Sequence, residues 1–293
     1  PKNQTILTWE DGPNRIYSIS SEQKHNSQIK ITDENFRHAQ KTWRGSGVAI
    51  PVFSLRSHHG FGIGEFSDLK LITDWISDLG MNLIQVLPVN DTIANKTWQD
   101  SYPYAAISVF ALHPLYINIP QIAPFKTKKH ALAYEVTKKE LNALESVDFE
   151  RVLDQKFTYL KILFDQEYDQ FKGDVEAQNF VATQKDWLLP YAAFCYLRDI
   201  YGTCNFGLWP KHAVFSQETI NTLCAEDFDD KKALEFYYFI QYHADKQLTN
   251  AKDYARSKRV VLKGDLPIGI YRYSCDAWVS PQLYNMDEQA GAP

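Results

Sequence analysis

A carboxylate, Asp265, stands directly after a short apolar run within the segment Arg259–Trp278. The run Val260–Leu262 is mostly β-branched and is followed by Gly264 and Pro267, which predicts a strand buried on both faces. In α/β folds, catalytic and binding residues gather at the carboxyl ends of buried parallel strands. The alternative is a structural role, in which the carboxylate only orders the next loop.

Two tyrosines flank Pro103 in the segment that follows the second predicted strand. The ring of Tyr104 can stack on a sugar ring, and its hydroxyl can donate a hydrogen bond. The alternative is a tight turn plugged by the rings of Tyr102 and Tyr104. The residue types alone leave both interpretations open.

A glycine-rich loop precedes the first predicted helix, with glycines at 60, 62 and 64. This spacing is G-x-G-x-G, whereas dinucleotide binding needs G-x-G-x-x-G, and no Lys-Ser or Lys-Thr follows as in a P-loop. His58 and His59 lack a third ligand at metal-binding spacing, so polar loop residues are favoured over a metal site. Serine hydrolase chemistry is not indicated because no G-x-S-x-G motif is present.

The elements predicted around these residues are one βαβ unit and a long connection from its second strand to the third strand. Apolar runs predict strands over Val48–Leu55 and Asn82–Leu87, with a helix between them that has Ser67 at its N-cap and Gly80 just after its end. A short connection of this kind makes the two strands parallel. The residues between Pro88 and the third strand carry apolar positions at helical spacing. The predicted helices are 128–145, 148–170, 175–201, 216–224 and 228–256.

The first 45 residues differ in character from the rest of the chain. Two short β-like runs flank the turn signal Glu10–Asn14, which predicts a hairpin over Trp9–Tyr17. Two strands alone are marginally stable, so we expect the hairpin to be the tail of a larger β domain. One more weak strand, Gln28–Thr32, and a polar linker follow. The expected organisation is a hairpin over 1–20, a linker over 21–45 and the main domain over 46–293.

Composition excludes several classes of protein. The chain has 31 basic and 36 acidic residues, a net charge of −5 without a basic block, which argues against nucleic-acid binding. It has no apolar run of about 18 residues, so no membrane span is expected. The amino terminus resembles no signal peptide and does not begin with Met, so we expect a piece of a longer cytoplasmic protein with reduced cysteines. Abundant aromatic residues favour a large core.

Three ordered motifs point to a known family. The segments GFGIGEFSDL, SYPYAAISVFALHPLYI and KGDLPIGIYRYSCDAW together resemble the 4-α-glucanotransferase family (amylomaltase, disproportionating enzyme). The forms SYPY, VFALHPLY and GDLPIG resemble its disproportionating enzyme 2 branch, which carries starch-binding modules ahead of the catalytic domain. The hairpin Trp9–Tyr17 resembles the end of such a module. Glu65 stands where the family often has Asp.

The resemblance implies a fold and a set of sugar-binding residues. The implied fold is α/β: the first three strands of a (β/α)8 TIM-type barrel with a large helical insertion at about 120–256, preceded by the tail of a β-sandwich starch-binding module. Tyr104 matches the family's active-site tyrosine, and Asp265 matches the aspartate after strand three that lines the donor site. Trp9 and Asn14 match the stacking and hydrogen-bonding residues of the starch-binding module; the alternative is a Trp that packs inward and an Asn that serves the turn.

The implied activity is transfer of α-1,4-glucan segments or glucosyl units by a retaining mechanism, without a metal or organic cofactor. Expected partners are maltose, maltooligosaccharides and starch- or glycogen-like α-glucans, with no nucleic acid or membrane. The family's catalytic carboxylates lie on later strands, in motifs such as R-I-D-H, which this chain does not contain. We therefore expect them after residue 293 and predict that the chain alone is inactive. The alternatives are a non-catalytic α-glucan-binding protein and a related barrel α-glucosidase that prefers water as acceptor.

Overall fold

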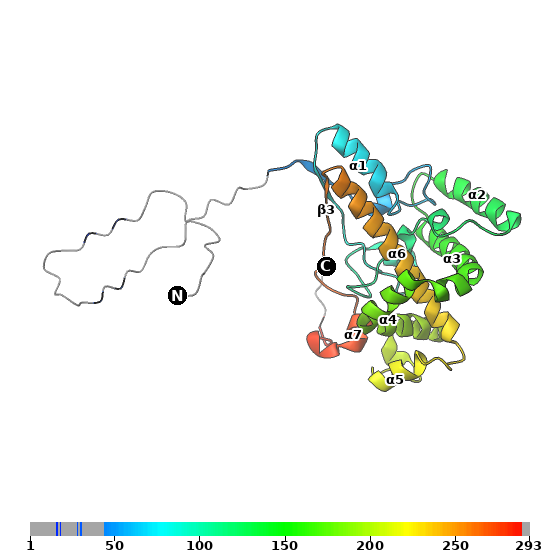
Figure 1. The fold of residues 1–293 in the computed structure, drawn as a ribbon. Helices are drawn as coiled ribbons and strands as arrows, with labels where there is room; N and C mark the ends of the chain where they lie inside the picture. The colour runs from blue at the N-terminus through cyan, green and yellow to red at the C-terminus, as the bar shows by residue number, and fades with distance from the viewer. Residues whose placement is uncertain (1–15, 17, 19–27, 29, 31–43, 289–293) are drawn as a thin grey trace. The chain divides into compact units, whose positions relative to one another are not determined.

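The computed structural model describes residues 16, 18, 28, 30 and 44–288 (Figure 1). The chain divides into two units, residues 1–45 and 46–293. Trp9 and Asn14 lie outside the described residues, as do nearly all positions of the predicted hairpin, weak strand and linker. The description below concerns the second unit, which carries the three motifs.

The second unit contains a three-stranded parallel sheet with the strand order β1-β2-β3. β1 (Gly47–Ala49) pairs with β2 (Leu83–Gln85), and β2 pairs with β3 (Val261–Lys263). The prediction of three parallel strands is confirmed. Gly47 is required at its position because a Cβ there would lie only 2.0 Å from the carbonyl oxygen of Leu83.

The strands are shorter and more exposed than predicted. Of the predicted strand Val48–Leu55, only Val48 and Ala49 lie in β1, and Val52–Ser54 forms a 3-10 turn after Pro51. The expectation that the third strand is buried on both faces was wrong, since the side chain of Val261 is 50% exposed. The physical reason is that side chains alternate along a strand: Leu262 packs against the core, whereas Val261 and Lys263 point to the opposite face, which is left exposed.

Helix α1 (Asp68–Asp78) connects β1 to β2. Ser67 occupies the N-cap position as predicted, but its side chain makes no capping hydrogen bond. Instead, the carboxylate of Asp68 accepts a hydrogen bond from the backbone N–H of Glu65 (2.7 Å). Gly80 follows the helix with φ of +72°, the left-handed conformation that glycine tolerates best.

Five helices fill the connection from β2 to β3, and their predicted positions are confirmed to within a few residues. They are α2 (Lys128–Asn142), α3 (Phe149–Gly173), α4 (Val175–Tyr201), α5 (Gln217–Leu223) and α6 (Lys231–Ser257). The long helix α6 contacts α1, α3, α4 and β3, so it joins the helical layer to the sheet (Figure 1). A short helix, α7 (Cys275–Val279), follows β3.

Aromatic side chains build much of the core, as their number predicted. Phe164 and Phe171 of α3 contact Phe239 of α6, with ring centroids 5.3 and 5.5 Å apart. The four cysteines are free thiols, in agreement with the prediction. Within the described part of the chain, no helix is long and apolar enough to cross a membrane.

Candidate functional site

Tyr104 and Asp265 lie in contact at the carboxyl end of the sheet, although 161 positions separate them in the chain. The Tyr104 hydroxyl donates a hydrogen bond to Oδ2 of Asp265 over 2.8 Å. The two residues come together because they follow β2 and β3, and the carboxyl ends of neighbouring parallel strands share one edge. The backbone N–H of Leu266 donates to the other carboxylate oxygen of Asp265 (3.0 Å).

Backbone hydrogen bonds tie the loop after β2 to the loop after β3. The N–H groups of Tyr271 and Cys275 donate to the carbonyl oxygens of Ala106 and Ile107, each over 2.8 Å. The carboxylate of Asp276 accepts a hydrogen bond from the N–H of Val109, also over 2.8 Å. These contacts hold the segment around Tyr104 beside the segment that follows Asp265.

A groove of about 1190 Å³ opens between these two loops. Tyr102 and Tyr104 line it from the first loop, with their ring centroids 5.6 Å apart. Its remaining walls come from residues 268–273, 277, 284–286 and 288, which include three further tyrosines and an arginine. Aromatic faces next to a few hydrogen-bonding groups are the usual lining of a sugar site.

The electrostatics of the contact keep Tyr104 a hydrogen-bond donor. The hydrogen bond to Asp265 raises the pKa of the Tyr104 hydroxyl, because it favours the protonated phenol beside a carboxylate. The hydroxyl is therefore neutral at pH 7. The carboxylate of Asp265 is half-buried and keeps free lone pairs, with which it can accept hydrogen bonds from the hydroxyls of a sugar.

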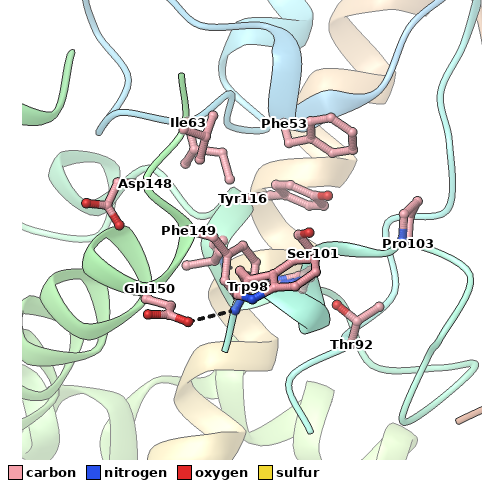
Figure 2. Close-up of a pocket in the computed structure, with 13 residues that line it drawn as sticks. Phe53, Ile63, Thr92, Trp98, Ser101, Pro103, Tyr116, Asp148, Phe149 and Glu150 are labelled. Carbon is pink, nitrogen blue, oxygen red and sulfur yellow. Dashed lines mark hydrogen bonds between the residues drawn. The ribbon is translucent and has the colours of Figure 1, made fainter. Parts of the chain in front are cut away.

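A second concave region lies beside the first turn of α3 (Figure 2). It has a volume of about 550 Å³ and is lined by apolar and aromatic side chains together with Asp148 and Glu150. The side chain of Trp98 at its rim is 68% exposed, and its backbone N–H donates to Oε1 of Glu150 (3.0 Å). An exposed indole next to carboxylates is chemically able to stack on a sugar ring and to bind its hydroxyls. The sequence analysis did not single out Trp98.

Comparison with known proteins identifies the family. The family model described as 4-alpha-glucanotransferase matches residues 50–293. The chain belongs to the 4-alpha-glucanotransferase family. It is 41% identical over 289 residues to the Oryza sativa subsp. japonica protein 4-alpha-glucanotransferase DPE2, covering 98% of this chain and 30% of that protein. It is 32% identical to a 4-alpha-glucanotransferase of Chlamydia caviae, covering 84% of this chain and 45% of that protein.

The fold also has a solved counterpart among amylomaltases. The amylomaltase from Streptococcus agalactiae in complex with acarbose superposes with a TM-score of 0.66 at 20% identity, covering 83% of this chain and 47% of that one. This likeness shows a shared fold. The chain spans less than half the length of each of these relatives. The family assignment inferred from the three motifs is confirmed.

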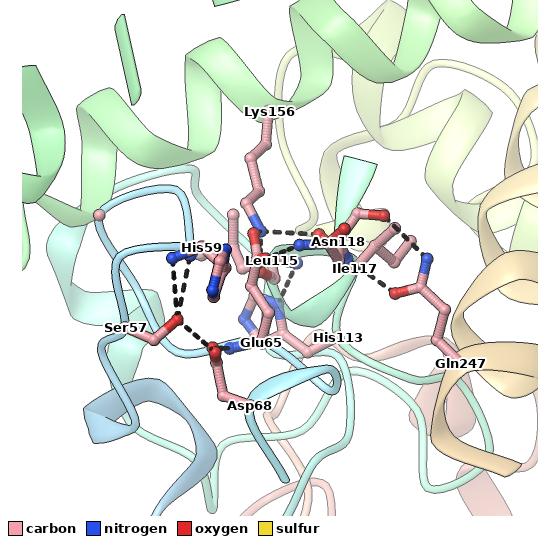
Figure 3. Close-up of polar contacts among 12 residues, drawn as sticks. Ser57, His59, Glu65, Asp68, His113, Leu115, Ile117, Asn118, Lys156 and Gln247 are labelled. Carbon is pink, nitrogen blue, oxygen red and sulfur yellow. Dashed lines mark hydrogen bonds and ion pairs between the residues drawn. The ribbon is translucent and has the colours of Figure 1, made fainter. Parts of the chain in front are cut away.

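In this member of the family, a buried charged cluster lies beside the glycine-rich loop (Figure 3). Glu65 and Lys156 are both fully buried, and Nζ of Lys156 lies 2.5 Å from Oε1 of Glu65. The same ammonium group donates to the carbonyl oxygens of Leu115 and Ile117, at 2.5 and 2.8 Å. The side-chain amide of Asn118 donates to Oε2 of Glu65 (2.6 Å). We call Glu65, Asn118 and Lys156 the Glu65 cluster.

The Glu65 cluster joins three segments that are distant in the sequence. Its members come from the glycine-rich loop, the segment before α2 and the first half of α3. Burial raises the pKa of Glu65 and lowers that of Lys156, and the opposite charge of each partner counteracts the shift of the other. The sequence analysis noted Glu65 only as a departure from the usual Asp. Nothing in the sequence pattern connects it with Lys156.

His113, which lies next to this cluster, provides a prediction for acid stability. It is buried, its Nδ1 accepts a hydrogen bond from the N–H of Leu115 (3.3 Å), and burial lowers its pKa from 6.5 to about 3. Between pH 6.5 and pH 3, His113 is protonated in the unfolded chain but stays neutral in the folded chain. The free energy of unfolding therefore decreases as the pH falls from 6.5 towards 3. We expect the stability difference between the natural protein and His113→Asn to shrink by about 2 kcal/mol from pH 7 to pH 5.

The measurement is urea unfolding of the full-length protein and the variant at both pH values. Asn is the matched replacement because its side-chain oxygen can still accept the N–H of Leu115 and it does not titrate. A difference that is equal at pH 7 and pH 5 would show that His113 is not held neutral.

The metal hypothesis gains no support from the geometry. Among residues 44–288, no group of three or more His, Cys, Asp and Glu side chains is arranged to hold a metal ion. His58 and His59 are both exposed loop residues.

Proposed function

We propose that this chain forms part of the sugar-binding groove of a 4-α-glucanotransferase. The full protein would transfer α-1,4-glucan segments or glucosyl units between maltooligosaccharides or glucans. The observation that carries the proposal is the contact of Tyr104, which lines an aromatic groove, with Asp265 at the carboxyl end of the parallel sheet. The names of the relatives, and the acarbose bound to the Streptococcus agalactiae protein, support an α-glucan as substrate.

We further propose that the three strands are the first three of a (β/α)8 barrel, with the helical insertion at about 120–256. In this architecture the groove would open on the barrel face where active sites lie. Residues 1–20 would be the end of a starch-binding module, with Trp9 and Asn14 as its sugar contacts, and residues 21–45 would link it to the barrel. The amylomaltase fold of the solved relative supports the barrel.

The proposed reaction is retaining and uses carboxylates that lie outside residues 1–293. A nucleophilic aspartate and an acid/base glutamate would form and then resolve a glucosyl-enzyme intermediate. The residues of this chain would bind and orient the sugar: the ring of Tyr104 would stack on it, and Asp265 would accept hydrogen bonds from its hydroxyls. The aromatic walls would exclude water, which favours a sugar hydroxyl as acceptor.

The test is incubation of the full-length protein with maltose or maltotriose, followed by chromatography of the products. A glucanotransferase yields free glucose together with longer glucans. Production of glucose without longer glucans would indicate the alternative of a hydrolytic α-glucosidase. Absence of both, with retention of glucan binding, would indicate the other alternative, a non-catalytic glucan-binding protein.

A further inference from the structure

Lys96 adopts a backbone conformation that long side chains rarely adopt. Its φ is +61°, in the left-handed region that favours glycine and asparagine. It lies in the loop Ile93–Asp100, between β2 and the tyrosines of the groove. The positive φ alone assigns no role to the side chain, since Arg259 shares it, so the contacts of this loop decide what Lys96 does.

The backbone of this loop wraps around the carboxylate of Asp100. The N–H groups of Ala94, Asn95 and Lys96 all donate to Oδ2 of Asp100, over 3.0, 2.8 and 2.6 Å. Successive N–H groups can converge on one anion when a residue of the loop is left-handed. Asp100 is 4% exposed and precedes Tyr104 by four positions, so this arrangement fixes the base of the turn that presents Tyr104.

The side chain of Lys96 attaches the same loop to helix α4. Its Nζ lies 2.8 Å from Oδ1 of Asp199, and the same oxygen accepts a hydrogen bond from Nε of Arg198 (3.0 Å). The Arg198 guanidinium also donates to the carbonyl oxygen of Ile93 (2.5 Å). Asp199 further accepts a hydrogen bond from the hydroxyl of Tyr237 on α6. Helix α4 therefore contacts both ends of the Ile93–Lys96 segment, and Tyr237 of α6 supports the α4 side chains that make these contacts.

On its other side, this segment contacts the wall of the groove. The side-chain amide of Asn95 donates to the hydroxyl of Tyr271 over 3.3 Å, and Tyr271 lines the groove. The segment therefore lies between the helical insertion, the turn of Tyr104 and the loop that follows Asp265.

Building on the proposed function, we propose that Lys96 and Asp199 are positioning residues for the sugar groove. Their ion pair fixes the loop around Asp100, and through it holds Tyr104 against Asp265. Lys96 and Asp199 do not touch the sugar in this proposal. Their side chains are 48% and 32% exposed, so the pair contributes little to global stability and its loss should be felt mainly in the groove.

The first test is Lys96→Gly in the full-length protein. Glycine suits the left-handed backbone, so the unfolding midpoint should stay within a few degrees, while kcat/KM for transfer from maltotriose should fall about tenfold. Lys96→Arg should retain most of the activity because it keeps the ion pair. The matched control is Arg259→Gly, another exposed residue with positive φ (59°), located just before the amino end of β3. Its activity should remain unchanged.

Two further readouts separate positioning from a general structural effect. In a Tyr104→Phe background, Lys96→Gly should cost much less than it does in the natural protein, because both changes act on the same contact. Lys96→Gly and Asp199→Asn should each speed amide hydrogen exchange in residues 91–104. This expectation does not depend on whether the full-length protein transfers sugar. Unchanged exchange would overturn the proposal, and so would an equal loss of activity in both backgrounds. An inactive natural protein would instead refute the proposed function, and exchange would still decide whether the ion pair orders the loop.

Discussion

Asp265→Asn is expected to lower kcat/KM for glucan transfer by at least about 100-fold in the full-length protein. Asn keeps the shape of the side chain but lacks the negative charge, so it accepts sugar hydroxyls less strongly and no longer forms a charge-assisted hydrogen bond with Tyr104. Asp265 is half-buried and is not part of the core, so the unfolding midpoint should change little. Initial rates of glucose release from maltotriose measure the effect.

The neighbouring tyrosines provide matched controls for this prediction. Tyr104→Phe removes only the hydroxyl that donates to Asp265, and a loss of about tenfold is expected from one such hydrogen bond. Tyr102→Phe makes the same chemical change two positions away, on a ring that is 60% exposed, and should change the rate by less than about threefold. Equal effects of the two phenylalanine variants would contradict the assigned role of the Tyr104–Asp265 contact.

Lys156→Met is expected to lower the free energy of unfolding by about 3–5 kcal/mol. The variant leaves the Glu65 carboxylate buried without its counter-charge and leaves the carbonyl oxygens of Leu115 and Ile117 without their donor. Met fills a similar volume, so the loss would come from charge and hydrogen bonding rather than from a cavity. Urea unfolding of the full-length protein, followed by tryptophan fluorescence, measures it.

Two other variants identify the cause of this loss. The double variant Glu65→Gln/Lys156→Met removes both charges and should be less destabilised than Lys156→Met alone. Lys232→Met breaks an ion pair of similar length, 2.6 Å to Asp165, in which both side chains are at least half exposed, and should cost less than about 1 kcal/mol. A double variant that is less stable than Lys156→Met would contradict the buried-pair explanation.

The sequence predicted the helices well because their signals are local. Helix α4 begins after Asp174, whose carboxylate caps the N–H groups of Glu176 and Ala177, and ends at Gly202 with its left-handed φ of 67°. These cap residues are adjacent in sequence to the helix ends that they mark. The apolar spacing located the helix without knowledge of its neighbours, and the caps in the structure agree with the predicted ends.

The polar contacts across the fold could not be predicted in the same way. Glu65 and Lys156 are 91 positions apart, and each is a common residue type in a segment with no unusual spacing. The same holds for Lys96 and Asp199, which only the packing of α4 against the loop brings together. Strand burial was also missed, because whether Val261 is covered depends on its place in the sheet and not on its own segment.

The juxtaposition of Tyr104 and Asp265 was half predictable. Each residue was singled out by its type and its place after a predicted strand, and the family motifs gave both a sugar-binding role. The distance between them follows from the pairing of β2 with β3, which the sequence indicated only as parallel strands in one domain. The roles of Trp9 and Asn14 stay predictions, since both lie outside the described residues.

Amide hydrogen exchange of the full-length protein with and without maltotetraose tests the location of the sugar site most directly. Bound glucan should slow exchange in the two walls of the groove, residues 102–105 and 268–273, while residues 128–142 of α2 should exchange at the same rate as without sugar. Protection of both walls in the natural protein, and its loss in Asp265→Asn, is the result that we predict. Maltotetraose binding that leaves exchange in both walls unchanged would contradict the assignment of this groove as the sugar site.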